Sequence, residues 1–457
     1  MQGSWLSKAG QKIWQSSGLN FALIESESAY FLGSPLGAEG VDEALKAKSQ
    51  ELNEISPRLA KLSSHEAFYL LKASFGMPRL LYLMRSAPTF GSSDLPALSA
   101  HIRELLSGTL NVQLEDDAWA QASLPVRWGG LGVRDVVSLS ASAFLSSRAA
   151  TASLVERILP LAATSGHCPL QQAALLSWSQ SGGTNAPTGA EAGKQRLWDD
   201  PVCSATFNSL LSRADRTSRA RLLAASAPDS GAWINTLPIR NLGLCLSDRE
   251  IRVAAGLRVG AQLVRQHSCV CGGAVDVLGH HGLFCRRSAG RHRRHAIAND
   301  VLVRAIRAAD VQAELEPRLL LLSEGGKRPD GATLDPWRMG RTLVWDFTCP
   351  DTLAPSHVSQ SASQAGSAAI LAEQQKRLKY AELASSNSII FSPVSIETLG
   401  TWGPSAAELC REIGSRLAQL SGDPRAHQFL VQRLALAVQR GNAASVAGTQ
   451  PSQDMSQ

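Results

Sequence analysis

The sequence predicts a multidomain protein in which a mostly helical first half is followed by a small α/β unit. Three observations lead to this prediction. Apolar residues recur at helical spacing between Val41 and about Ala150. Cysteines and histidines gather between Cys269 and Cys285, and helical segments alternate with short strand-like segments beyond Arg293. A chain of 457 residues has room for two or three domains of the usual size, about 100–200 residues each.

The composition is that of a globular chain, with 44% hydrophobic and 18% charged residues. Because the net charge of +6 is modest, local clusters of arginine matter more than the total. The eight cysteines are scattered and only three lie close together, which predicts a reducing compartment rather than a disulfide framework. With neither a signal-like first segment nor an apolar run approaching 18 residues, we expect no secretion and no membrane partner.

The first half is expected to begin with strands and continue as helices. Residues 1–40 hold two strand-like segments, at 21–24 and 30–37, and look like the end of a domain that began elsewhere. Residues 41–178 are expected to form a helical domain. Its predicted elements are helices over 41–62, from 63 onward, over 95–110 and from 135 onward, with a glycine-rich turn over 124–132 between the last two. Ser63 and Glu66 have the spacing of a capping box at the second helix.

A small, polar segment at 179–195 is predicted to be a flexible linker. Residues 196–266 follow as a helical connector that carries four closely spaced arginines. These are Arg213, Arg216, Arg219 and Arg221. A solvated helix face is their simplest interpretation, and contact with nucleic acid is the alternative.

The Cys/His cluster at 267–288 predicts a structural zinc site. Cys269, Cys271, His280 and Cys285 supply four soft or borderline donors within a short span that is rich in glycine. Three thiolates and one imidazole suit tetrahedral zinc, and a full shell of protein ligands indicates a structural role. Either His281 or His267 could replace His280 as the fourth ligand.

A dense basic patch follows this cluster. It comprises Arg286, Arg287, Arg291, Arg293 and Arg294, together with His292 and His295. Arginine at the start of a helix opposes the helix dipole, which favours an external anion at this place. We therefore predict nucleic-acid contact for these five arginines and for Arg328, with a solvated helix start as the alternative.

Two carboxylates and a lysine follow, in an α/β unit at 289–403. A helix is predicted over 293–308, with strands over 313–316, 319–322 and 341–348. Alternation along the last strand separates Trp345 from Asp346, which lie on opposite faces. Glu373, Lys376 and Tyr380 follow on one face of a helix predicted over 364–384. The chain should end with a strand over 388–394, two helices within 404–440 and a disordered tail over 441–457.

The segment from about 15 to 150 resembles the region after the polymerase active site in reverse transcriptases of non-LTR retrotransposons. Residues 30–37 are similar to a primer-grip turn, and the helices with the Leu124–Gly132 turn are similar to an all-α thumb. The paired metal-binding aspartates of such a polymerase precede the primer grip, whereas Asp116–Asp117 and Asp199–Asp200 follow it here. We therefore expect that this chain alone does not polymerise.

The second half resembles the restriction-like-endonuclease class of the same elements, in which a zinc knuckle precedes an α/β restriction-endonuclease-like domain. That class joins Arg/Lys-Pro-Asp to a second Asp and to a downstream Lys and Tyr, which match Asp330, Asp346, Lys376 and Tyr380 here. Thr348 stands where many nucleases of this fold keep their lysine, so Lys376 would supply the ammonium from its helix. The resemblance implies catalysis by these four residues.

The chemistry of that site predicts a catalytic Mg²⁺ held by Asp330 and Asp346, with Glu316 completing its shell. The resemblance then implies an endonuclease that nicks chromosomal DNA for target-primed reverse transcription. Its partners would be DNA and element RNA, without a small-molecule cofactor, and its location would be the nucleus. The alternative is a catalytically inactive, zinc-containing nucleic-acid-binding fragment.

Overall fold

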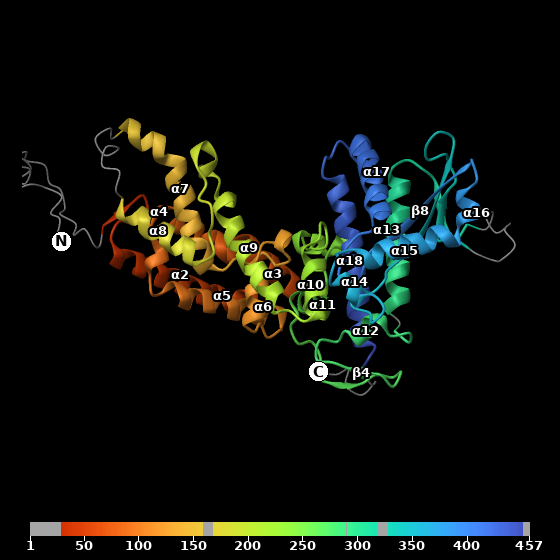
Figure 1. Ribbon diagram of the computed structural model, residues 1–457, viewed down its shortest axis with the longest axis horizontal. Helices are drawn as coiled ribbons and strands as arrows, with labels where there is room; N and C mark the ends of the chain where they lie inside the picture. The colour runs from red at the N-terminus through yellow and green to blue at the C-terminus, as the bar shows by residue number, and fades with distance from the viewer. Residues whose placement is uncertain (1–28, 159–167, 289, 318–327, 451–457) are drawn as a thin grey trace, which may run out of the picture.

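The computed structural model describes residues 29–158, 168–288, 290–317 and 328–450. The protein is mostly helical with a small mixed sheet, and it is elongated (Figure 1). Helices of the first half occupy one end, and the sheet with its covering helices occupies the other. Within the described ranges, each helix is too short or too polar to cross a bilayer.

The first half consists of long and short helices joined by turns. Its elements are β1 Tyr30–Phe31, β2 Ser34–Pro35, α2 Ala38–Leu59, α3 Ser64–Leu70, η2 Leu71–Phe75, η3 Met77–Arg79, α4 Leu81–Ser86, η4 Thr89–Gly91, α5 Leu95–Leu110, α6 Asp116–Ala122, η5 Val126–Trp128, α7 Val136–Ile158 and α8 Pro169–Gln180. Ser63 and Glu66 form the capping box predicted for α3. The glycine-rich turn after α6 uses left-handed backbone at Gly129 and Gly132, with φ of +83° and +79°.

The middle of the chain consists of helices followed by a two-stranded hairpin. Its elements are η6 Gly189–Gly193, α9 Gln195–Arg213, α10 Arg216–Ser226, η7 Ala232–Asn235, η8 Arg240–Leu242, α11 Asp248–Val259, β3 His267–Ser268, β4 Ala274–Val275 and α12 His281–Phe284. The segment predicted to be a flexible linker packs against its surroundings. Ala192 is buried, and the Trp198 indole donates to its carbonyl at 2.8 Å. The prediction of a flexible linker is therefore wrong here, because this polar segment forms an ordered connection.

The α/β unit contains the four-stranded sheet and six helices. Its elements are α13 Gly290–Ala308, β5 Ala313–Leu315, β6 Gly331–Thr333, β7 Thr342–Thr348, α14 Val358–Ser361, α15 Ser367–Lys379, α16 Ala381–Ala384, β8 Ile389–Ser395, α17 Pro404–Ser421 and α18 Ala426–Ala447. The strand order is β5-β6-β7-β8, antiparallel except for the parallel pair β7 and β8. That parallel pair requires a crossover, which α14, α15 and α16 supply.

The two faces of β7 pack against different helices, as the alternation predicts. Leu343, Trp345 and Phe347 lie in a core with residues of α13, α17 and α18. Val344, on the other face, packs with Tyr380 and with Phe391 of β8. Asp346 therefore projects on the side of α15, away from the larger core.

One hydrophobic core runs through both halves of the chain. It contains Leu45 of α2 and Ile251 of α11 as well as Leu436 and Val446 of α18. Helix α18 also packs against α13 and α17 of the α/β unit. Helix α18 thus joins the interior of the helical half to the separate core beneath the sheet.

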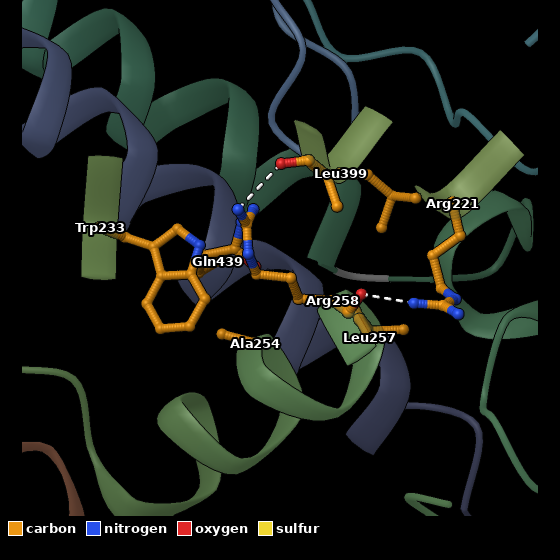
Figure 2. A pocket seen from close by; sticks show the side chains of 8 residues that line it. Arg221, Trp233, Ala254, Leu257, Arg258, Leu399 and Gln439 are labelled. Carbon is orange, nitrogen blue, oxygen red and sulfur yellow. Dashed lines mark hydrogen bonds between the residues drawn. The ribbon is translucent and has the colours of Figure 1, made fainter. Parts of the chain in front are cut away.

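Two buried arginines lie where these parts meet (Figure 2). Arg258 of α11 donates to the carbonyls of Gly130, Val126 and Ala225 at 2.8–3.0 Å. Arg221 of α10 donates to the carbonyl of Arg258 at 2.6 Å and to the Gln121 amide. The interpretation of Arg221 as part of a solvated face is therefore wrong, because its guanidinium is buried and donates to the last turn of α11 and to the Gln121 side chain.

These arginines and Trp233 line a cavity of about 10 Å³, room for roughly one water molecule. Burial lowers the pKa of Arg221 to about 10. Burial and the charge of Arg221 together lower the pKa of Arg258 to about 9.

The end of the chain differs from its prediction. Helix α18 continues to Ala447, and Asn442, Ser445 and Val446 are buried, so residues 441–450 are not a disordered tail. Their alanine-rich composition suits a buried helix as well as a loose one. The strands predicted at 21–24 and 319–322, and residues 451–457 of the predicted tail, lie outside the described residues.

Candidate functional site

Four metal-binding side chains gather at the β3–β4 hairpin and α12. The donor atoms of Cys269, Cys271, His281 and Cys285 all lie within 4.8 Å of one another. Two sulfurs bonded to one tetrahedral zinc at about 2.3 Å each are roughly 3.8 Å apart. The Sγ atoms of Cys269 and Cys285 are 3.8 Å apart, so this Cys3His cluster could hold a metal such as zinc.

The fourth member of the cluster is His281 rather than His280. His281 begins α12, and its Nε2 lies 3.2 Å from Cys271 Sγ. His280 is buried, and its Nδ1 lies 3.6 Å from the Asp276 carboxylate, away from the thiols. His267 is also engaged elsewhere, with Nε2 3.1 Å from the Thr449 hydroxyl. Consecutive residues in a helical turn point about 100° apart, which is why only one of the two neighbouring imidazoles reaches the sulfurs.

Two glycines of the hairpin allow the backbone to turn tightly and to approach the His281 ring. Gly272 adopts a left-handed φ of +86°, and a Cβ on Gly273 would meet the His281 ring at 2.6 Å. The Gly273 amide, 3.4 Å from Cys271 Sγ, lowers the pKa of that thiol to about 6. Burial raises the pKa of Cys269 to about 11. A bound cation would favour thiolates at both positions.

The basic residues beyond the cluster divide into a surface group and one buried residue. Arg286, Arg287, Arg291 and Arg293 are exposed. Arg294 is only 2% exposed and donates to Asn442 and Ser445 of α18, each at 3.0 Å, and to the Leu283 carbonyl. The prediction that Arg294 contacts nucleic acid is therefore wrong, because its guanidinium is inside the junction of α12, α13 and α18.

A second cluster lies between β7 and α15, about Asp346. This carboxylate is buried and forms an ion pair with Lys376 through Oδ1. Its Oδ2 accepts from the Tyr380 hydroxyl at 2.6 Å. Burial and the hydrogen bond to Asp346 raise the pKa of Tyr380, so the phenol stays neutral and donates. The structure thus brings three of the four predicted catalytic residues together.

Asp330 directly precedes β6, the strand that neighbours β7. Gly331 of β6 pairs with Trp345 of β7, so continuing the register by one residue sets Asp330 opposite Asp346. The Asp330 carboxylate accepts from the Phe347 amide at 2.6 Å and contacts His295 Nε2 of α13 at 2.9 Å. The two carboxylates are therefore adjacent in register but held by different helices, Asp330 by α13 and Asp346 by α15.

Opposing effects act on these ionisable groups. Burial alone would raise the pKa of Asp330, but the hydrogen bond and charge of His295 and the Phe347 amide outweigh it, and the pKa lies below its ordinary value. The hydrogen bond to Asp330 in turn raises the pKa of His295. Asp330 is therefore an anion under ordinary conditions, as a cation ligand must be.

Three residues that the sequence analysis associated with this site, Glu316, Arg328 and Glu373, lie at its margin or outside it. The Glu316 carboxylate is exposed and pairs with Arg328 at 3.1 Å, and Arg328 also donates to the Glu316 carbonyl. Glu373 does not project with Lys376 and Tyr380. Its oxygens accept from the Ser405 and Ala406 amides at 3.1 and 3.0 Å, so it caps α17.

Three further residues complete the cluster, and sequence patterns gave them no site role. His295 and Asn299 are one turn apart on α13, where they looked like part of a basic helix. Lys379 donates to the Tyr380 hydroxyl at 2.9 Å. Only the spacing of His295 and Asn299, which puts both on one helix face, could have linked them.

The aspartate pairs at 116–117 and 199–200 serve other roles. Asp116 and Asp117 begin α6 and pair with Arg103 and Arg213 at 2.8 and 3.1 Å. Asp199 and Asp200 lie on α9 and pair with Arg134 and Arg127. Each pair is matched by arginines of the helical half.

Comparisons with known proteins bear on what the chain as a whole resembles. No family model matches the chain. Over 377 residues it is 24% identical to a protein named Retrotransposable element SLACS 132 kDa protein, from Trypanosoma brucei gambiense. The comparison supports a retrotransposon-related protein. The aligned region covers 79% of this chain but only 27% of the trypanosome protein, so the chain spans about a quarter of its relative.

Proposed function

We propose that this chain carries the metal-dependent DNA endonuclease of a non-LTR retrotransposon, which nicks target DNA for target-primed reverse transcription. One observation carries the proposal. Lys376 and Tyr380, both supplied by the end of α15, meet the Asp346 carboxylate on β7, and Asp330 lies opposite in register. Two acids on the inner part of the sheet and an ammonium from α15 suit hydrolysis of a phosphodiester.

The residues present fit a magnesium ion. Mg²⁺ is usually bound through one or two carboxylates, with waters and substrate phosphates as its remaining ligands. Asp330 and Asp346 would supply those carboxylates, whereas Glu316 already pairs with Arg328. When bound, the ion would polarise the phosphate and lower the pKa of a coordinated water.

The other side chains of the cluster have separable roles. The Lys376 ammonium, 24% exposed and paired with Asp346, is available to a phosphate oxygen on which negative charge develops. Tyr380 donates to Asp346 and so fixes the carboxylate rather than taking part in proton transfer. Lys379, which contacts the Tyr380 hydroxyl, adds positive charge for a phosphate backbone.

The Cys/His cluster and its exposed arginines would anchor the nucleic acid. Arg286, Arg291 and Arg293 follow a cluster that fits zinc, so a folded knuckle would present a positive surface to phosphates. DNA and element RNA are the proposed partners, and the nucleus is the proposed location. These arginines also favour a second candidate, a zinc-containing nucleic-acid-binding protein without catalysis.

Plasmid nicking tests the proposal. The purified chain should convert supercoiled DNA to open circles with Mg²⁺ but not with EDTA. Asp346→Asn keeps the shape of the side chain and should reduce nicking roughly 100-fold or more. Asp300→Asn, which removes a carboxylate paired with Arg304 on α13, is the matched control. Equal nicking by wild type and Asp346→Asn would overturn the proposal. Salt-sensitive binding without any cleavage would favour the second candidate.

A further inference from the structure

We infer that a hydrogen-bonded chain from Trp345 through Asn299 to His295 positions the Asp330 carboxylate, which makes His295 a positioning residue of the proposed nuclease. The inference rests on the proposed function. Its first member lies in the core, because Trp345 is fully buried and Asn299 is only 4% exposed. Its last member faces the site, since the His295 side chain is 47% exposed.

Three contacts form the chain. The Trp345 indole nitrogen lies 3.0 Å from Asn299 Oδ1. Asn299 Nδ2 lies 3.4 Å from His295 Nδ1. His295 Nε2 lies 2.9 Å from Asp330 Oδ2. Side-chain contacts thereby link β7, helix α13 and Asp330.

The chemistry of the donors fixes the direction of every link. An indole N–H can only donate, so the Asn299 oxygen must face Trp345 and the Asn299 amide nitrogen must face His295. In the neutral ring, Nδ1 of His295 then accepts a hydrogen bond, which assigns the ring proton to Nε2. This Nε2–H donates to Asp330. A tryptophan two links away therefore selects the histidine tautomer.

The last link determines how the carboxylate is held. Asp330 Oδ2 accepts from two groups on different elements, the His295 imidazole of α13 and the Phe347 amide of β7. The ring of His295 is itself placed edge-on against Phe347, with centroids 6.0 Å apart. Two donors at one oxygen restrict rotation of a carboxylate that a single donor would leave free. Partners of this kind typically change metal affinity 10–100-fold when they are removed.

Metal binding, measured without cleavage, tests the inference. Mn²⁺ is titrated into the full chain with its zinc site filled, and free Mn²⁺ is followed by electron paramagnetic resonance. His295→Ala should weaken binding about 10–100-fold, and His295→Gln, which keeps a donor of similar reach, should restore most of the affinity. His101→Ala is the matched control, because His101 lies on α5 of the helical half, with Nδ1 3.2 Å from the Ser49 hydroxyl.

The outcomes separate this inference from the proposed function. If Asp330→Asn loses Mn²⁺ but His295→Ala binds it as wild type does, the positioning role is wrong and the nuclease proposal survives. If Asp330→Asn also binds as wild type does, the proposed metal site is wrong. Nitrogen-15 spectra of the histidines provide a second readout that needs no metal. The signal that disappears in the His295→Gln variant belongs to His295. In the neutral ring this signal should show the Nε2–H tautomer, and an Nδ1–H tautomer would overturn the inference.

Discussion

The Cys/His cluster and the carboxylate cluster about Asp346 are assembled in different ways. All four donors of the first come from one hairpin and the short helix after it, between Cys269 and Cys285. The second needs residues of α13, β7 and α15 and the residue before β6. These segments meet only after the parallel crossover has formed. A local site is fixed by chain geometry near each residue, whereas the other site depends on the register of a sheet.

This difference predicts which cluster survives damage elsewhere. The hairpin can gather its ligands as soon as a cation is present, because metal binding and local folding are coupled. Asp346 and Lys376 remain together only while α15 lies on its sheet face. The following changes test that contrast, from the largest expected effect to the smallest.

Loss of a thiol should have the largest effect. Cys269→Ser should abolish binding of one zinc per chain and unfold residues 267–288, because structural zinc contributes about 10–16 kcal/mol in finger peptides. Zinc content by atomic absorption and proteolysis of the hairpin measure this. Cys168→Ser, a half-buried cysteine outside the cluster, is the control. Unchanged zinc content in Cys269→Ser would refute the site.

Loss of the ammonium should affect the other cluster without unfolding it. Lys376→Met keeps the aliphatic stem but leaves Asp346 without its cation, so nicking should fall about 100-fold. The zinc content should stay at the wild-type value, because no element is shared by the two clusters. Gel quantification of open circles measures the first effect. Arg377→Met, a neighbour that donates to Ser405 instead, should nick at close to the wild-type rate.

Neighbouring arginines should separate stability from binding. Arg294→Ala removes a buried guanidinium from Asn442, Ser445 and the Leu283 carbonyl, so it should cost about 2–4 kcal/mol of unfolding free energy. Arg293→Gln should leave that free energy within about 0.5 kcal/mol, since the Arg293 side chain is 53% exposed and lies 3.7 Å from Glu250. It should instead make the plot of log affinity against log salt concentration less steep, by the amount expected for about one lost phosphate contact. If Arg294→Ala changed only DNA binding and Arg293→Gln changed only stability, the roles assigned to the two arginines would be wrong.

A buried acid away from both clusters should give the smallest effect. Burial raises the pKa of Glu397 above 4.5, against hydrogen bonds from Ala369 and Thr352. The folded state therefore holds this proton more tightly, and the associated stability is lost as pH rises through the folded pKa. Glu397→Gln is neutral throughout. Relative to wild type, the stability of this variant in urea unfolding should increase as the pH rises through the folded pKa of Glu397, and the exposed Glu382→Gln is the control.

Local patterns predicted most of what is local. The capping box at Ser63 and the alternation of β7 follow from spacings of two or three residues, and the thiols follow from a short cysteine-rich span; the structure has each of them. The choice between His280 and His281 was beyond a spacing rule, because it depends on which imidazole the first turn of α12 directs at the sulfurs.

Burial was the main property that local patterns missed. Arg221, Arg258 and Arg294 have the sequence surroundings of surface arginines, but each satisfies carbonyls or amides contributed by distant segments. The same limit applies to His295 and Glu373, whose partners come from other elements. A guanidinium can be buried without an acid when enough carbonyls converge on it, and only the tertiary structure reveals such convergence.

The shared core has a consequence for how the protein denatures. Side chains from α2 to α18 pack in one continuous interior, and Arg258 of α11 ties the turn before α7 to the Ser230 region. Neither half retains a complete hydrophobic interior when the other is lost. A calorimeter should therefore record one cooperative heat-absorption peak for the whole chain rather than two.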